Sequence, residues 1–408
     1  MKLLLVADSY PPEICAVSSL MNELALSLVD RGHKISVLTC KPQNRVKEGT
    51  EHNYSLVSNE NNVTVIRVPI PKIHANSLVK RGINTVLLPS VLYSRTPKTI
   101  RYDNYDGIIV YSPPVSLGLA AKKIAVLNDA PMILMLRDIF PQNAIDLGIL
   151  KSKLVIKYFE HVERKLYEAS DYILAQSYEN RQFLCERKQL DEGKVGVLYN
   201  WVDSSKYYRN ETTNFRDKFR LDGKKVCVFA GTIGPSQGLE KLLSVARLVG
   251  DNDVLFLFVG NGREKDNLMK KAKSMQLTNV RFEDYVEPDE YPSLLKSVQL
   301  GLVSLSENNH TPIVPGKLLG YMAAGIPIMA FLNKESTDTM RIIDESGCGE
   351  YVTDGDIDTF SKKMRVMLSD DDLRITMGNN GRKYVETSFS VVNAAEEVER
   401  AIIKVRTS

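Results

Sequence analysis

The residues best suited to chemistry in this sequence of 408 residues lie in a glycine-rich turn between an apolar strand and a helix. The turn follows Phe229 and places Gly231, Gly234 and Gly238 ahead of the helical run that begins at Leu239. Glycine lets a ligand approach backbone N–H groups closely, and the start of a helix adds partial positive charge. The pattern therefore indicates a phosphate site, and an ordinary strand-to-helix turn is the alternative.

Two more turns of this kind follow in the same half of the chain. One places Gly260 and Gly262 before Arg263, and the other places Gly316 before Lys317. A cation in the first turn of a helix opposes the helix dipole, so Lys317 needs either an anionic ligand or a neighbouring carboxylate. The carboxyl ends of parallel strands meet at one edge of a sheet, where ligands bind in open α/β sheets. We therefore expect the three turns to converge on one site.

Short apolar runs alternate with helical patterns along nearly the whole chain, as is typical of parallel sheets covered on both faces. Strands are predicted at Lys2–Ala7, Lys34–Cys40, Val63–Val68, Gly107–Tyr111, Met132–Leu136, Tyr172–Gln176 and Val195–Leu198, and again at Val226–Ala230, Val254–Val259, Val280–Phe282, Leu300–Ser304, Pro327–Phe331 and Glu350–Val352. Helices are predicted at Ser18–Arg31, Val155–Ser170, Leu239–Val249, Arg263–Met275, Glu290–Lys296, Lys317–Ala324, Thr337–Glu345, Thr359–Leu368 and Val391–Val405. This order predicts an α/β fold with two doubly wound, Rossmann-like domains.

The domain boundaries are set by a polar stretch without strong periodicity, residues 200–224, which we predict to be a linker. We expect an N-terminal domain over residues 1–199 and a C-terminal domain over residues 225–385. Residues 386–408 should then form a C-terminal helix that packs back toward the N-terminal domain.

The composition excludes several classes of protein. The net charge of +3 is too small to argue for nucleic acid as a partner. The five cysteines are scattered without a C-x-x-C pair, which argues against a disulfide framework or zinc site and favours a cytoplasmic location. The longest uncharged stretches run about 15 residues, short of the ~18–20 that a membrane span needs. The apolar N-terminus is interpreted as a first strand rather than a signal peptide.

Several stretches resemble one enzyme family, the GT-B glycosyltransferases of family 4. The donor-domain motifs are Ala230–Leu243, Val259–Leu268, Pro315–Ala330 and Met377–Val385, and the first half agrees at Asp8–Glu13, Arg31–Thr39 and Leu198–Asp203. The resemblance implies two Rossmann-like domains facing a central cleft and a retaining, metal-independent transfer from a nucleotide sugar, UDP-linked in our interpretation, to a lipid-linked saccharide. Within the family, Leu136–Pro141 and the Gln237–Glu240 turn resemble bacterial N-acetyl-L-fucosamine transferase type enzymes of surface polysaccharide synthesis, such as capsule or O-antigen.

The resemblance places the donor in the C-terminal domain, although this chain departs from the family at four positions. Thr232 and Gln237 stand where many members carry Arg and Lys, and Pro312 and Gly320 stand at the two Glu positions of E-x7-E. Lys317 then becomes a catalytic candidate that neutralises the diphosphate as the leaving group departs. The candidate nucleotide-sugar residues are Gly231, Thr232, Gln237, Gly238, Gly260, Gly262, Arg263, Val286, His310, Gly316, Lys317 and Leu318. The loop Glu307–His310 is a candidate for the sugar contacts, with a solvated polar loop as the alternative.

The acceptor is expected at the carboxyl edge of the first domain. The candidate residues there are Tyr10, Pro11, Glu13, Ser112, Arg137 and Asp138. Asp138 is the second catalytic candidate, orienting the acceptor hydroxyl or the donor sugar. Retention needs no protein nucleophile, because the departing phosphate can accept the proton of the acceptor on the same face.

Three other features have simpler interpretations. Asp354–Asp356 and Asp370–Asp372 imitate metal motifs but are predicted to cap helices. His33 lies in a helix-to-strand turn and is predicted to be structural. Residues 72–101 carry six basic residues and no acid, which favours docking on the anionic inner leaflet of the membrane, with a basic lid over the first domain as the alternative.

Two other functions stay open on the sequence. A UDP-sugar 2-epimerase would share the fold, although the cleft segments supply few of the carboxylates and histidines that it needs. A non-catalytic scaffold of a polysaccharide assembly complex would explain the lost Glu pair and the lost Arg/Lys pair.

Overall fold

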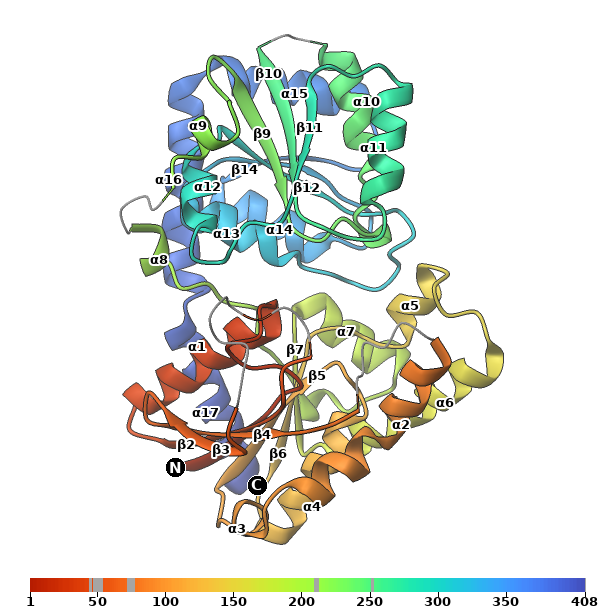
Figure 1. Cartoon of the computed structure of the whole chain (residues 1–408), viewed down its shortest axis with the longest axis vertical. Helices are drawn as coiled ribbons and strands as arrows, with labels where there is room; N and C mark the ends of the chain where they lie inside the picture. The colour runs from red at the N-terminus through yellow and green to blue at the C-terminus, as the bar shows by residue number, and fades with distance from the viewer. Residues whose placement is uncertain (44–45, 47–53, 72–77, 209–212, 251–252, 408) are drawn as a thin grey trace. The chain divides into compact units, whose positions relative to one another are not determined.

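The computed structural model describes residues 1–43, 46, 54–71, 78–208, 213–250 and 253–407, with side chains for all of them except 78–83 and 85. The chain divides into two compact units (Figure 1). The first comprises Met1–Trp201 and Val391–Ser408, and the second comprises Val202–Ser390.

The first unit is built on a sheet of eight strands in the order β3-β4-β2-β1-β5-β6-β7-β8. All neighbours pair in parallel except β3 and β4. β3 was not predicted, because its sequence Val-Ser-Asn-Glu is polar and partly exposed at the sheet edge. The strands are β1 (Lys2–Val6), β2 (Lys34–Cys40), β3 (Val57–Glu60), β4 (Val63–Val68), β5 (Gly107–Ser112), β6 (Met132–Leu136), β7 (Tyr172–Ala175) and β8 (Val195–Val197).

Helices cover both faces of this sheet, which separates two hydrophobic cores. Alternate strand residues point to opposite faces: Leu4 and Val6 pack with α2, α4, α6 and α7, whereas Leu3 and Leu5 pack with α1 and α17. The helices are α1 (Ala16–Asp30), α2 (Leu78–Arg95), α3 (Lys98–Arg101), α4 (Leu117–Asn128), α5 (Gln142–Asp146), α6 (Lys153–Ala169), α7 (Tyr178–Arg187), the 3-10 turn η1 (Glu192–Lys194) and α17 (Val391–Thr407).

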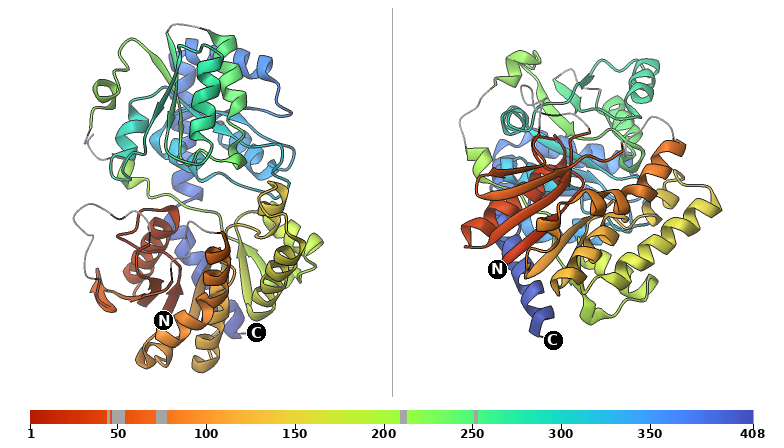
Figure 2. Two further views of the ribbon diagram at one scale, coloured as in Figure 1. Left: turned by 45° about the vertical axis from the view of Figure 1, so that its right-hand side comes forward. Right: turned by 60° about the horizontal axis from the view of Figure 1, so that its bottom comes forward.

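The last helix, α17, belongs to the first unit, and both chain ends lie there (Figure 2). Ala394, Val398 and Ile402 are buried in the core that α17 shares with α1. Ile402 fits closely against β5, since a Cβ on Gly107 would lie 3.2 Å from its Cδ1. Helix α17 therefore completes a core that begins more than 300 residues earlier in the chain.

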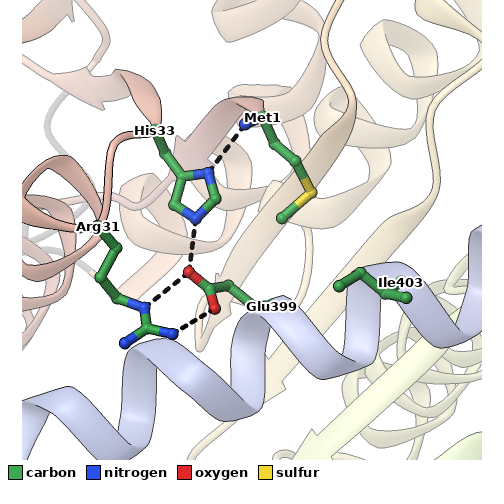
Figure 3. Close-up of a pocket in the computed structure, with 5 residues that line it drawn as sticks. All are labelled: Met1, Arg31, His33, Glu399 and Ile403. Atoms are coloured by element: carbon green, nitrogen blue, oxygen red, sulfur yellow. Dashed lines mark hydrogen bonds and ion pairs between the residues drawn. The ribbon is translucent and has the colours of Figure 1, made fainter.

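A shallow pocket of about 620 Å³ lies beside α17 at the amino edge of this sheet (Figure 3). His33 Nδ1 lies 2.9 Å from the Met1 amino group and Nε2 lies 2.5 Å from Glu399. Arg31 donates two hydrogen bonds of 2.8 and 2.7 Å to the same carboxylate. Because these charged groups bind one another, and because the pocket lies opposite the ligand edge of the sheet, we assign it a structural role. This agrees with the structural role predicted for His33.

The second unit is a sheet of six parallel strands in the order β11-β10-β9-β12-β13-β14. Its strands are β9 (Lys225–Ala230), β10 (Val254–Val259), β11 (Val280–Glu283), β12 (Leu300–Ser304), β13 (Ile328–Phe331) and β14 (Gly349–Val352). Its helices are α8 (Ser205–Tyr208), α9 (Phe215–Lys218), the 3-10 turn η2 (Pro235–Gln237), α10 (Glu240–Val249), α11 (Lys265–Ser274), α12 (Tyr291–Lys296), α13 (Gly316–Ala324), α14 (Thr337–Ser346), α15 (Ile357–Ser369) and α16 (Asp371–Ser388). Two Rossmann-like α/β units confirm the predicted fold class.

Four smaller findings bear on the sequence predictions. The described part of residues 200–224 carries α8 and α9, and Tyr207 and Phe215 are buried. Asp356 accepts the backbone N–H of Thr359 at 3.0 Å and Asp370 that of Leu373 at 2.9 Å, which confirms capping at these two positions. Among the residues with described positions, no group of three or more His, Cys, Asp or Glu could hold a metal ion, and no helix is long and apolar enough to cross a membrane.

Candidate active site

The glycine turns after β9 and β10 interlock through their backbones. Gly231 N–H donates to Val259 at 2.9 Å, and Ile233 N–H donates to Asn261 at 3.0 Å. A Cβ on Gly260 would lie 2.0 Å from the Gly231 carbonyl oxygen. Gly260 has a φ of 142°, a conformation that L side chains rarely adopt. Glycine is therefore required here for the two turns to approach each other.

The loop after β12 joins the same cluster. Ser306 N–H donates to the Ser236 carbonyl at 2.9 Å, and the Asn309 amide donates to the same carbonyl at 2.8 Å. Gly238, just before α10, has a φ of 56°, and a Cβ there would lie 3.1 Å from Ser306 Cα. Three strand-end loops of the second sheet thus meet at its carboxyl edge, as the sequence predicted.

Lys317, in the first turn of α13, reaches back into this cluster. Its Nζ donates a hydrogen bond to Gln237 Oε1 and lies 4.0 Å from the centroid of the Phe229 ring. Its Cε lies 3.4 Å from where a Cβ on Gly231 would be. Burial lowers the pKa of Lys317 to about 7. The sequence left open a neighbouring carboxylate as the partner of Lys317, but the hydrogen-bond partner is a neutral amide. The ammonium group is therefore suited to an anionic ligand.

The other predicted donor residues differ in how much side chain they present. Thr232, Arg263, Gly316 and His310 are exposed, and Gly262 lies in the interlocked turn, where a Cβ would meet the Ile233 carbonyl at 2.1 Å. Leu318 is buried and Val286 is 8% exposed, so these two can offer a ligand little beyond their backbone groups.

The loop Glu307–His310 is only partly available for a sugar. Glu307 forms an ion pair of 2.6 Å with Lys241, and this lysine holds the pKa of the carboxyl below its usual range. Asn309 is buried against Ser236. Asn308 and His310 are exposed.

Two tyrosines pack against Gly320, the residue at the second Glu position of the family's E-x7-E motif. A Cβ on Gly320 would lie 3.3 Å from Tyr207 Oη and 3.3 Å from Tyr291 Cε1. The next residue, Tyr321, is also buried, and its hydroxyl accepts the N–H of Ala230 at 3.0 Å. A glutamate at position 320 would have to displace this aromatic packing, so the departure seen in the sequence is built into the fold.

The carboxyl edge of the first sheet collects polar groups that lack partners. Arg137, directly after β6, donates its backbone N–H to Ser112 of β5 at 2.9 Å. Buried polar groups in proteins are almost always hydrogen-bonded. Here the buried atoms without a partner among the described residues include Asp8 Oδ1, Ser112 Oγ, Arg137 Nε and Nη2, Asn200 Oδ1 and Trp201 Nε1. Such unmet bonding capacity at the ligand edge of an α/β sheet indicates a binding site.

Three charged groups at this edge have shifted pKa values. Burial, together with the nearby Glu13, raises the pKa of Asp8 to about 7. Burial raises the pKa of Asp138 as well, against the opposing effect of Arg137. Burial lowers the pKa of Arg137 to about 10, while its guanidinium donates to the Leu198 carbonyl and lies 5.7 Å from the Trp201 ring. Shifts of this kind are frequent at functional sites.

Asp8 was not among the acceptor-edge residues that we predicted from the sequence. The available signals were its place directly after the first strand, and so at the carboxyl edge, and its membership of the Asp8–Glu13 stretch that resembles the family. By contrast, Tyr10 is buried and donates to Asn22 at 3.0 Å, the Pro11 carbonyl accepts from Arg67, and Glu13 accepts the Gln43 N–H at 3.3 Å. These three residues hold the loop after β1 in place.

Comparison with known families identifies the class of protein. Residues 17–206 match the model described as Glycosyltransferase Family 4, and residues 210–384 match Glycosyl transferases group 1. Together the two models span nearly the whole chain. The chain belongs to the family-4 glycosyltransferases and is an enzyme of the hexosyltransferase type.

Curated relatives agree with this assignment. The chain is 26% identical to the glycosyltransferase WbjE of Pseudomonas aeruginosa, over 68% of this chain and 70% of the relative. It is 25% identical to WcaI of Escherichia coli, described as a colanic acid biosynthesis glycosyl transferase, over 80% and 82%. It is 28% identical to the O-antigen biosynthesis glycosyltransferase WclY of Escherichia coli, over 44% and 50%.

Solved structures share the fold over the whole chain. Sucrose-phosphate synthase of Thermosynechococcus elongatus aligns with a TM-score of 0.76 at 15% identity, covering 100% of this chain and 99% of that one. HepE of Anabaena, crystallised with UDP and glucose, aligns with a TM-score of 0.71 at 15% identity, covering 99% and 100%. Both likenesses confirm the GT-B fold.

Proposed function

We propose that this glycosyltransferase is a retaining enzyme that moves a sugar from a UDP-linked donor to a lipid-linked saccharide in the synthesis of a bacterial surface polysaccharide. The observation that carries the proposal is the placement of Lys317 beside the two interlocked glycine turns, with a neutral amide as its partner. Support for the donor comes from HepE, which was crystallised with UDP. Support for the pathway comes from the names of WcaI and WclY.

The donor diphosphate would bind at the carboxyl edge of the second sheet. The N-terminal turns of α10 and α13 offer backbone N–H groups and partial positive charge, and Lys317 adds a full charge once it is protonated. As the sugar–phosphate bond breaks, negative charge grows on the diphosphate, and groups already aimed at that charge stabilise the transition state more than the ground state. In this proposal these protein groups meet the charge without a metal ion, and Arg263 at the start of the neighbouring helix is a further contributor.

The acceptor hydroxyl would be oriented at the carboxyl edge of the first sheet. Asp138, our catalytic candidate there, is joined by Asp8, because both carboxylates are poorly solvated and Asp8 has an unmet oxygen. The proton of the hydroxyl passes to the departing phosphate oxygen on the face where the new bond forms, so the configuration at the anomeric carbon is retained. Arg137 and Ser112 supply further polar contacts.

The finer identity of the sugar is also part of the proposal. We propose an N-acetylated deoxyamino sugar, because Leu136–Pro141 and Gln237–Glu240 resemble enzymes of the N-acetyl-L-fucosamine transferase type. We also propose that the enzyme works in the cytoplasm, peripherally associated with the inner membrane from which a lipid-linked acceptor would be presented.

The experiment is a panel of UDP sugars incubated with the protein and a membrane lipid extract, followed by mass spectrometry of the lipid fraction. A new lipid-linked saccharide supports the proposal. Conversion of UDP-N-acetylglucosamine to its 2-epimer without acceptor would favour the epimerase instead. Absence of UDP binding at millimolar nucleotide would favour a scaffold.

A further inference from the structure

The start of α6 and the loop before it expose a group of large apolar side chains. Leu154 is 81% exposed, the highest value for a large apolar side chain among the described residues. Ile149, Val155 and Tyr158 are 49, 39 and 37% exposed. Contiguous exposed apolar surface on a folded protein indicates an interaction site. We call Ile149–Tyr158 the α6 patch.

The α6 patch is basic as well as apolar. Lys151, Lys153 and Lys157 are all exposed between the apolar residues. No acidic residue occurs from Leu147 to Phe159. Interleaved lysines and apolar side chains match an anionic lipid surface, since the ammonium groups meet lipid phosphates while the apolar groups enter the boundary between headgroups and chains.

The rest of α6 shows that this face is unpartnered within its own unit. The buried side chains are Val162, Glu163, Leu166 and Tyr167, one and two turns beyond the patch. At 100° per residue Leu154 and Tyr158 fall on the opposite side of the helix from Glu163 and Tyr167. Farther along the helix, exposed Arg164 and Lys165 are accompanied by exposed Glu168, so the basic excess belongs to the α6 patch. The helix therefore packs by its C-terminal half and leaves its N-terminal turns uncovered in this unit.

The fold places the patch at the acceptor edge of the first sheet. β6 ends at that edge, and α6 must run back across the sheet to reach the start of β7, so its first turns lie near the end of β6 (Figure 1). The Phe159 ring packs edge-on against Phe140 with centroids 4.9 Å apart. Phe140 is two residues after Asp138. A surface that docks on lipid here would sit beside the residues proposed to receive the acceptor.

We infer that the α6 patch docks this protein on an anionic phospholipid bilayer. The inference rests on the proposed function only for the purpose of docking, which would bring the enzyme to its lipid-linked acceptor. Vesicle binding itself can be measured without any transfer reaction. It assigns to α6 a role that the sequence suggested for residues 72–101. Residues 72–77 of that segment lie outside the described residues, as do the side chains of Lys80 and Arg81. Of the described basic residues there, Arg95 donates to the Pro69 carbonyl at 2.6 Å and Arg101 lies 4.8 Å from the Tyr93 ring.

The test is co-sedimentation of the full chain with vesicles of phosphatidylcholine, alone or mixed with phosphatidylglycerol. We expect binding only to the mixed vesicles and release at high salt. The double variant Leu154→Glu/Val155→Glu and the triple variant Lys151→Glu/Lys153→Glu/Lys157→Glu should each weaken binding by roughly tenfold or more.

The matched control is Lys270→Glu/Lys273→Glu on α11, where exposed lysines flank exposed Met269 in the second unit. This variant should bind the mixed vesicles like the unmodified protein. Circular dichroism and UDP titration should show that all variants keep their fold and nucleotide site. Unchanged binding by both α6 variants, equal loss in the α11 control, or failure of the unmodified protein to bind mixed vesicles would each overturn the inference. Vesicle binding by a protein that fails to bind UDP would instead contradict the proposed function and leave the docking surface standing.

Discussion

Lys317 combines a charge, a buried setting and a neutral partner, and these properties make donor affinity depend on pH. Its pKa is about 7 without ligand and should rise when the anionic diphosphate binds. The gain in affinity is therefore complete below about pH 7 and is lost as pH rises toward the pKa of the complex. Titration calorimetry with a UDP sugar should show affinity falling by up to about tenfold per pH unit above 7. Lys317→Arg, which stays charged, should bind with a flatter profile; a flat profile in the unmodified protein would contradict this role.

Asp8 should control the acidic side of the pH profile. If its carboxylate orients the acceptor, kcat/KM for the acceptor should rise as pH approaches the pKa of about 7 and then level off. Asp8→Asn should remove that limb and lower the rate. It should also raise the free energy of unfolding above pH 4, because the native state no longer holds a poorly solvated carboxylate whose pKa exceeds its value of 3.8 in the unfolded chain. Loss of stability together with a preserved acidic limb would assign Asp8 a purely structural role.

The sequence predicted where the functional residues lie in the fold better than it predicted which residues they contact. Lys317 and Gly231 were predicted to share a site because both lie at strand ends of one sheet. The contacts of Gly320 with Tyr207 and Tyr291, and the unmet oxygen of Asp8, depend on packing between residues far apart in the chain. No local pattern encodes such contacts.

Two glycines at the donor edge differ in whether the fold has room for a side chain in their place. Gly260→Ala would drive a Cβ into the Gly231 carbonyl, whereas a Cβ on Gly316 would meet nothing within 4 Å. We expect Gly260→Ala to lower the free energy of unfolding by about 2–3 kcal/mol or more and to abolish UDP binding. Gly316→Ala is the control, with stability changed by less than about 1 kcal/mol. Urea denaturation of both variants measures the difference, and equal stability would show that the interlocked turns are not needed.

An ion-pair cluster joins α17 to the turn after α1. Arg31, together with His33, lowers the pKa of Glu399 from 4.5 to about 2. A carboxyl with a depressed native pKa stabilises the fold above its unfolded pKa, and this contribution fades as pH falls from about 4.5 toward 2. Glu399→Gln should therefore lower the free energy of unfolding by about 1–2 kcal/mol at pH 7 and by much less near pH 2. Thermal denaturation at both pH values checks this; a difference that does not depend on pH would assign the effect to packing.

The strands show which elements a sequence reveals. Every predicted strand is present. Most of them are covered on both faces, so they are apolar throughout and stand out between polar turns. β3 escaped because an exposed edge strand needs no such run. The helix predicted at Val391–Val405 is present as α17 (Val391–Thr407). Its partners Arg31 and His33 were not predicted, since they lie more than 350 residues earlier.

One unit of the molecule holds a cation beside glycine turns, and the other has poorly solvated carboxylates at its acceptor edge. Neither feature depends on the small net charge of the chain. We propose that these edges serve transfer from a UDP sugar to a lipid-linked saccharide, with Lys317 stabilising the departing diphosphate.

The most direct test measures transfer from the active UDP sugar to membrane lipid extract by the unmodified protein and by Lys317→Ala. We expect a lipid-linked product in which the anomeric configuration of the donor is retained. We also expect the variant to lose turnover by about 10²–10³-fold, with an unchanged circular dichroism spectrum. Near-normal turnover by Lys317→Ala, or a product with inverted configuration, would contradict the account.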